Sequence, residues 1–120
     1  MADLTIADII GADDLNILTV KVPEWKKDGE AGTVYLRLMT VGERDAYECE
    51  WLANKEKGVP NFRSKFLARC LCDKDGNRIF TDAQVEQLAT KSVAVVDRLF
   101  KRAMKHNAMS MADVEELAGE

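Results

Sequence analysis

The chain has 120 residues, which suits one domain with its own core and is too short for two ordinary ones. Hydrophobic residues at 47% and charged residues at 32% exclude a disordered chain, and no apolar run approaches the ~20 residues of a membrane span. The net charge of −4 argues against a nucleic-acid binder that works by general electrostatic attraction.

The cysteines and the N-terminus indicate the compartment. Cys49, Cys70 and Cys72 are an odd number at uneven spacing, which is typical of free thiols in a reducing environment. The first four residues, Met-Ala-Asp-Leu, do not form a basic stretch followed by an apolar run, so they predict no secretory signal. We therefore expect a soluble cytoplasmic protein.

Residues 1–14 are predicted to be a flexible N-terminal arm, and residues 15–120 a single domain. The arm favours a short helical turn around three isoleucines, Ile6, Ile9 and Ile10. Gly11 and the acidic pair that follows it would end this turn. Because little lies nearby for these side chains to pack against, the arm is expected either to be mobile or to dock on a partner.

Two segments, residues 15–22 and 33–40, alternate aliphatic and polar residues and predict an antiparallel pair of strands. In the second segment, the alternation places Val34, Leu36 and Leu38 inward and Tyr35 and Arg37 outward. The ten residues between them carry an Asp28-Gly29 turn signal and predict a long charged loop. Trp25 in this loop is expected either to fold back over the sheet edge or to contact a partner.

The rest of the chain carries repeated helix start signals. Thr40 with Glu43, and Thr81 with Gln84, have capping-box spacing, and Ser92 suits an N-cap. The first of these helices is expected to end at Gly58. Pro60 suits the start of another helix through residues 61–72, and Ser110 is expected to cap a short terminal helix with Val114 and Leu117.

The apolar positions of these helices predict their buried sides. Tyr47 and Trp51 are four residues apart and are interpreted as a core stripe rather than a ligand site. The helix over residues 61–72 has Phe62, Phe66, Leu67 and Cys70 along one side. The helix after Ser92 repeats apolar residues at helical spacing: Val93, Val96, Leu99, Phe100, Ala103 and Met104.

Metal-binding and catalytic patterns are incomplete. Asp73, Asp75 and Asn77 suggest a calcium loop, but the sixth position, Arg78, is not Gly, and the twelfth, Gln84, is not Glu. We interpret this stretch as a solvated turn.

Other catalytic and ligand-binding patterns are equally incomplete. The Cys70-Leu71-Cys72 spacing does not fit a zinc site. His106, the only histidine, is expected to act as a helix-end cap rather than a general base. The basic residues near the central and later helices are interpreted as solvated faces, with a protein partner or nucleic acid as alternatives. We predict no enzyme activity, no metal and no cofactor.

Residues 66–107 carry a family resemblance. A helix ending in Leu-Ala-Arg is followed by DKDGNRIF, then D-x-x-V-x-x-L, then Lys-Ser, Arg-Leu-Phe and a closing Asn107. The pattern extends back through VYLR at 34–37 and TVGERD at 40–45. Over roughly residues 17–117, this chain resembles the tail assembly chaperones of long-tailed bacteriophages.

The resemblance implies a non-catalytic protein that binds the long helical tape-measure protein, keeps it soluble and helps to recruit the major tail protein that builds the tail tube. Members of such families are often also made as a frameshifted fusion with a longer C-terminal extension. The resemblance further implies action in the host bacterial cytoplasm and absence from the mature virion. Self-association fits this role, because a chaperone that coats a long protein must act in many copies.

We therefore expect an α+β domain with an N-terminal antiparallel hairpin followed by four to five helices. The partner is expected to contact exposed apolar side chains, for which the candidates are Trp25, Tyr35, Trp51 and Met104. The first alternative is a structural virion component such as a head–tail connector subunit. A small regulatory nucleic-acid binder is the second, and an enzyme is the third.

Overall fold

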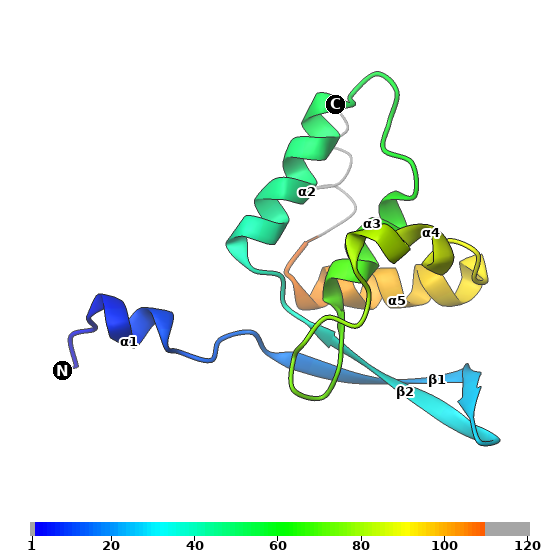
Figure 1. The fold of residues 1–120 in the computed structure, drawn as a ribbon, viewed down its shortest axis with the longest axis horizontal. Coiled ribbons are helices and arrows are strands. Elements are labelled where there is room, and N and C mark those ends of the chain that lie inside the picture. The colour runs from blue at the N-terminus through cyan, green and yellow to red at the C-terminus, as the bar shows by residue number, and fades with distance from the viewer. Residues whose placement is uncertain (1, 110–120) are drawn as a thin grey trace.

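The computed structural model describes residues 2–109 (Figure 1). Its elements in chain order are α1 (Ile6–Ile10), β1 (Ile17–Lys27), β2 (Glu30–Arg37), α2 (Val41–Ala53), α3 (Phe62–Cys70), β3 (Leu71–Cys72), the 3-10 turn η1 (Asp82–Gln84), α4 (Val85–Leu88) and α5 (Val93–His106). This order confirms the predicted α+β class, with a hairpin followed by helices. The helix predicted after Ser110 lies outside the described residues.

β1 and β2 form one long antiparallel hairpin, and the predicted long loop is wrong. Lys27 pairs with Glu30, so Asp28 and Gly29 alone make the turn, with φ of +53° and +80°. Positive φ at both central residues is the geometry of the tight turn that best matches strand twist. The other residues of the predicted loop extend the two strands.

A bulge in β1 accommodates the difference in length between β1, with 11 residues, and β2, with 8. Val22 pairs with Gly32, but the next pair is Lys26 with Ala31, so residues 23–25 have no partner across the sheet. A Cβ atom at position 32 would lie 2.1 Å from the Trp25 carbonyl oxygen. Only glycine therefore fits opposite this bulge.

The short strand β3 makes β2 the central strand of the sheet. Leu36 pairs with Leu71 and Tyr35 pairs with Cys72, although the sequence predicted a helix through residue 72. The helix ends two residues earlier because both side chains of β3 are buried and its backbone is used by the sheet. The turn after β3 holds this arrangement, since Asp73 Oδ1 accepts hydrogen bonds from the Asp75 and Asn77 amides at 2.9 and 3.0 Å.

Arg37 was predicted to face outward and is instead 5% exposed. Its guanidinium Nη2 lies 2.6 Å from Glu43 Oε2, and Arg78 Nη1 is 3.9 Å from the same oxygen. Glu43, in the first turn of α2, lies against Arg37 and accounts for its burial, because α2 follows β2 directly. Strand alternation alone does not reveal the covering segments.

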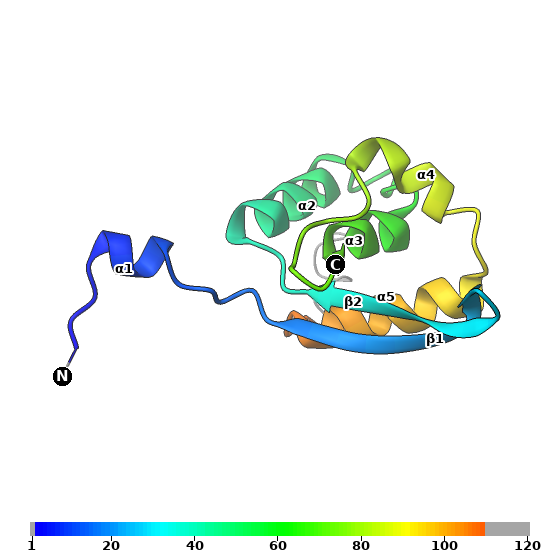
Figure 2. The same cartoon turned by 60° about the horizontal axis from the view of Figure 1, so that its bottom comes forward.

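Five aromatic rings form the centre of the core. α3 packs against α5, α4 and the sheet, and brings its aromatic side between α2 and α5 (Figure 2). The rings meet edge to face with centroids 5.3–6.4 Å apart: Tyr47, Trp51, Phe62, Phe66 and Phe100. The prediction that Tyr47 and Trp51 form a core stripe is confirmed.

The helix starts predicted within residues 2–109 are confirmed, whereas two helix ends differ. Thr40 and Glu43 form a reciprocal capping box, with nitrogen–oxygen distances of 2.9 and 3.1 Å, and Gln84 accepts from the Thr81 amide at 2.9 Å. α2 ends at Ala53, before Gly58, because the Asn54 side chain donates to the Glu50 carbonyl oxygen at 2.8 Å.

Asn107 connects three parts of the fold just after α5. Its Oδ1 accepts from the Met39 amide at 2.8 Å, and its Nδ2 donates to the Ala103 carbonyl oxygen at 2.8 Å. The Arg44 guanidinium donates to the Asn107 carbonyl oxygen at 3.3 Å. One side chain thus joins the β2–α2 connection to the end of α5.

Replacing Asn107 with alanine is expected to lower the free energy of unfolding by about 1–3 kcal/mol, since a buried amide loses its acceptor. Urea denaturation followed by circular dichroism measures this change. Asn107→Asp keeps the acceptor for Met39 and should cost less. Equal stability of the alanine variant and the wild type would contradict the connecting role.

Candidate partner-binding surfaces

The residue types that bind metals are dispersed in the part of the chain that the structure describes. Among residues 2–109 no group of three or more His, Cys, Asp or Glu side chains is placed to hold a metal ion. His106 ends α5, and its Nε2 lies 2.8 Å from the Asn16 carbonyl oxygen, so the ring ties the start of the hairpin to α5. Binding surfaces are therefore the features to consider.

The four partner-binding residues predicted from the sequence do not form one surface. Trp51 and Met104 are buried, so the expectation that they are exposed is wrong: both pack in the core, as large apolar side chains usually do. Trp25 and Tyr35 are half-buried, and Trp25 packs against the core from the hairpin bulge. Their contact with a partner stays a prediction.

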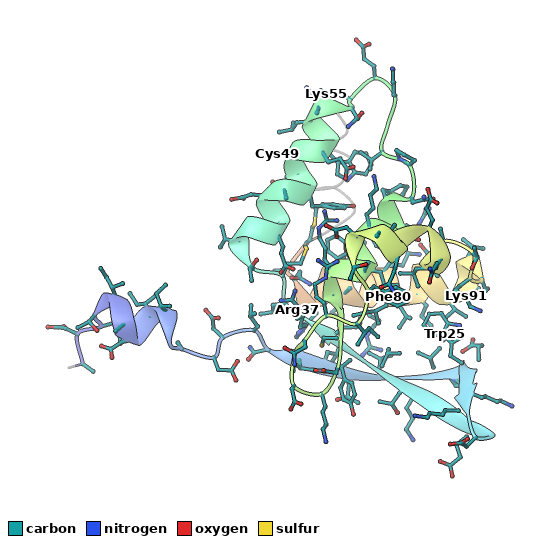
Figure 3. All side chains as sticks on the ribbon, viewed as in Figure 1. Trp25, Arg37, Cys49, Lys55, Phe80 and Lys91 are labelled. Atoms are coloured by element: carbon teal, nitrogen blue, oxygen red, sulfur yellow. The ribbon has the colours of Figure 1, made fainter. Side chains whose placement is uncertain are left out.

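The outward side of α2 is an exposed, largely uncharged helix face. Tyr47 and Trp51 anchor the opposite side of this helix in the core. The outward residues are small or apolar apart from one aspartate, and all are exposed; we call them the α2 face: Val41, Gly42, Asp45, Ala46, Cys49, Leu52 and Ala53. Val41 is 79% and Leu52 53% exposed, and Cys49 points away from the other helices (Figure 3). A partner helix could approach this face closely.

A second exposed apolar feature is the N-terminal arm, which we define as residues 2–14. The figures show α1 held apart from the domain, and all five of its residues are exposed (Figures 1 and 2). Its capping box joins Thr5 and Asp8, with the Thr5 amide 2.9 Å from Asp8 Oδ2. These hydrogen bonds from Thr5 lower the pKa of Asp8. Leu4 and Ile9 occupy the positions of a hydrophobic staple.

A hollow of about 250 Å³ lies between the first turns of α3 and α5. We call it the α3–α5 groove, and its lining is Asn61, Phe62, Arg63, Ser64, Ala89, Lys91, Val93 and Val96. Val93 begins α5 and is 72% exposed, whereas the larger apolar residues that follow it in that helix are buried. A neighbouring hollow shares Arg63 and Val93 and adds Lys101 and Asp97. The groove therefore combines an apolar floor with a mostly basic rim.

A family model described as phage tail assembly chaperone matches residues 13–120. The chain belongs to the phage tail assembly chaperone family. The match includes the α2 face and the α3–α5 groove of the chaperone, but begins after α1. No curated protein and no solved structure matched the chain in the same comparisons. Among the helices that the structure describes, none is long and apolar enough to cross a membrane.

The three thiols of the chaperone differ sharply in access. Cys49 is exposed on the α2 face, whereas Cys70 and Cys72 are buried. Burial raises the pKa of Cys70 to about 12 and also raises that of Cys72. Since the thiolate is the reacting form, the two buried cysteines are protected both sterically and by protonation.

We expect Ellman's reagent to modify one thiol of the native chaperone rapidly and the other two only after unfolding. The absorbance of the released thiolate measures the number of reacting groups. In Cys49→Ser the rapid phase should disappear. Rapid modification of two or three thiols in the native protein would contradict the burial of β3 and the end of α3.

The α2 face was not predicted from the sequence, because the predicted binding residues were the largest apolar ones, which folding tends to bury. A signal was present: on a helix, Val41, Cys49 and Leu52 lie opposite Tyr47 and Trp51. A second apolar side on a helix whose first side already fills the core indicates a contact outside the domain. The groove brings together residues from distant parts of the chain and had no local signal.

Proposed function

We propose that this chaperone binds an amphipathic helix of the tape-measure protein on its α2 face, keeps that protein soluble and helps to recruit tail-tube subunits. Family membership supports a role in tail assembly. The single observation that carries the choice of surface is the exposed apolar side of a helix whose other side is fixed in the core. The chaperone performs this role without catalysis.

The α2 face suits a helical partner for physical reasons. Tyr47 and Trp51 hold α2 rigidly, so little conformational entropy is lost when a partner binds. Ala46 and Cys49 are small and allow a second helix to come close, while Val41 and Leu52 provide apolar area at either end. This is the arrangement by which amphipathic helices are recognised.

Co-expression with the tape-measure protein of the same phage, followed by pulldown and a solubility assay, tests the proposal. Val41→Asp and Leu52→Asp are expected to raise the dissociation constant about 10- to 100-fold, because each places a charge in an apolar contact. Ile79→Asp is the matched control, since Ile79 is 52% exposed against 53% for Leu52 and lies outside the α2 face.

Two results would refute the proposal. One is a tape-measure protein that stays insoluble and unbound beside a folded chaperone. The other is equal loss of binding in Ile79→Asp and Leu52→Asp. Protection of Cys49 from Ellman's reagent in the complex gives an independent reading of the same surface.

We further infer that the chaperone acts in the host cytoplasm and is absent from the finished particle. Mass spectrometry of purified virions tests this directly. Its presence at a fixed copy number per particle would favour the alternative of a head–tail connector subunit.

A further inference from the structure

We propose that the N-terminal arm of one chaperone docks in the α3–α5 groove of a second copy, and so links chaperones to one another. The inference goes beyond the proposed binding of the tape-measure protein and involves different residues. Most of the arm precedes the residues that the family model matches, whereas the groove lies within them.

The arm has the properties of a segment that becomes ordered on docking. An isolated helix shorter than about 12 residues is marginal in water, and α1 has five residues with none buried. Its apolar side chains are nevertheless among the most exposed in the described chain, with Ile6 at 82%. Leu4, Ile9 and Ile10 share this exposure. Docking would cover this apolar surface and stabilise the helical turn.

The charges of the arm and the groove are complementary. Residues 2–14 include four aspartates, Asp3, Asp8, Asp13 and Asp14, and no lysine or arginine. The groove presents Phe62, Val93 and Val96 as apolar lining and Arg63 and Lys91 as basic lining. The neighbouring hollow adds Lys101. The one carboxylate in the lining of the two hollows, Asp97, already pairs with Arg63 at 3.1 Å and Lys101 at 2.9 Å. An acidic apolar segment therefore fits this groove.

The position of the arm favours the groove of another copy over its own. The arm leaves the domain at Asn16, which is held beside His106 at the C-terminal end of α5. The groove lies at the other end of α5, roughly 20 Å away for a helix of 14 residues at about 1.5 Å each. The six residues from Ile10 to Asn16 span roughly 20 Å only when fully extended, so the arm would reach its own groove only as a taut, straight chain. α1 also lies on the far side of the domain from the start of α5 (Figures 1 and 2).

The test compares the mass of the full-length chaperone with that of an arm variant and a groove variant, by sedimentation equilibrium. The arm variant is Ile6→Asp with Ile9→Asp, and the groove variant is Val93→Asp; these positions are exposed, so the fold should be retained. We expect the wild type and the Ile79→Asp control to associate. Both variants should be monomeric, with dissociation constants raised about 100-fold.

Mixing the two variants distinguishes docking between copies from a general loss of association caused by the added charges. The arm variant keeps an intact groove and the groove variant keeps an intact arm. An equimolar mixture should therefore form a complex that neither variant forms alone. Lys91→Glu should weaken association, and added salt should do the same.

A monomeric wild type, or a mixture that stays monomeric, would overturn the proposal. Association that persists in the arm variant would do so as well. If the arm variant instead lost only tape-measure binding, the arm would be a site for the tail protein.

Discussion

Phe66→Ala is expected to lower the free energy of unfolding by about 3–5 kcal/mol, a large part of the 5–15 kcal/mol typical of a domain. Phe66 is fully buried and lies between two aromatic rings, with centroids 5.3 Å from Tyr47 and 5.4 Å from Phe100. Alanine would leave a cavity where α2, α3 and α5 meet, and rigid helices cannot close it.

Thermal unfolding followed by circular dichroism measures the effect. At about 4 °C per kcal/mol, the midpoint should fall by roughly 12–20 °C. Ile79→Ala is the control and should change stability by less than about 0.5 kcal/mol, because its side chain is largely exposed. A midpoint for Phe66→Ala within a few degrees of the wild type would mean that the aromatic cluster is not the centre of the core.

Glu43→Ala is expected to have a comparable effect, with a loss of about 3–5 kcal/mol. Glu43 pairs with Arg37 at 2.6 Å and also completes the capping box at the start of α2. Its removal leaves the Arg37 guanidinium buried without a counter-charge, which costs more than the pair itself contributes. Arg37→Met with Glu43→Ala removes the stranded charge and should recover part of the loss, as urea denaturation would show. If the double variant recovered nothing, the stranded guanidinium would not be the cause.

Glu43 also gives stability a defined pH dependence. Burial raises the pKa of its carboxyl, but the Thr40 amide and the Arg37 guanidinium lower it by more, so it lies below the ordinary value of 4.5. The folded state therefore binds this proton more weakly than the unfolded state. The stabilisation is complete above about pH 4.5 and is lost as the pH falls through the folded pKa. Glu43→Ala should lack this part of the acid-induced loss.

The sequence predicted the elements whose signals are local. The capping boxes at Thr40 and Thr81 and the N-cap at Ser92 each depend on residues within four positions of one another. The spacing of Tyr47 and Trp51 also indicates a buried side without knowledge of what covers it. For the same reason, the hairpin and the order of helices followed from the chain alone.

The errors have a common cause in contacts between distant residues. Leu71 and Cys72 are extended because β2 pairs with them, and nothing near them in the chain indicates this. Arg37 is buried against Glu43, whose carboxylate also lies 3.9 Å from Arg78 Nη1. The residues of a partner-binding surface were harder still to predict. Trp51 and Met104 are as large as typical binding residues, but both are buried in the core.

The contacts that α5 makes with the hairpin have a consequence for synthesis. The Arg98–Glu24 pair and the Asn107–Met39 hydrogen bond join residues 74 and 68 positions apart. The hairpin leaves the ribosome before α5, which packs with Val22 and Leu36 in the same core. Until then a nascent chain exposes an apolar sheet that is prone to aggregate. This protein, which serves assembly, thus completes the core of its own domain only after α5 has been synthesised.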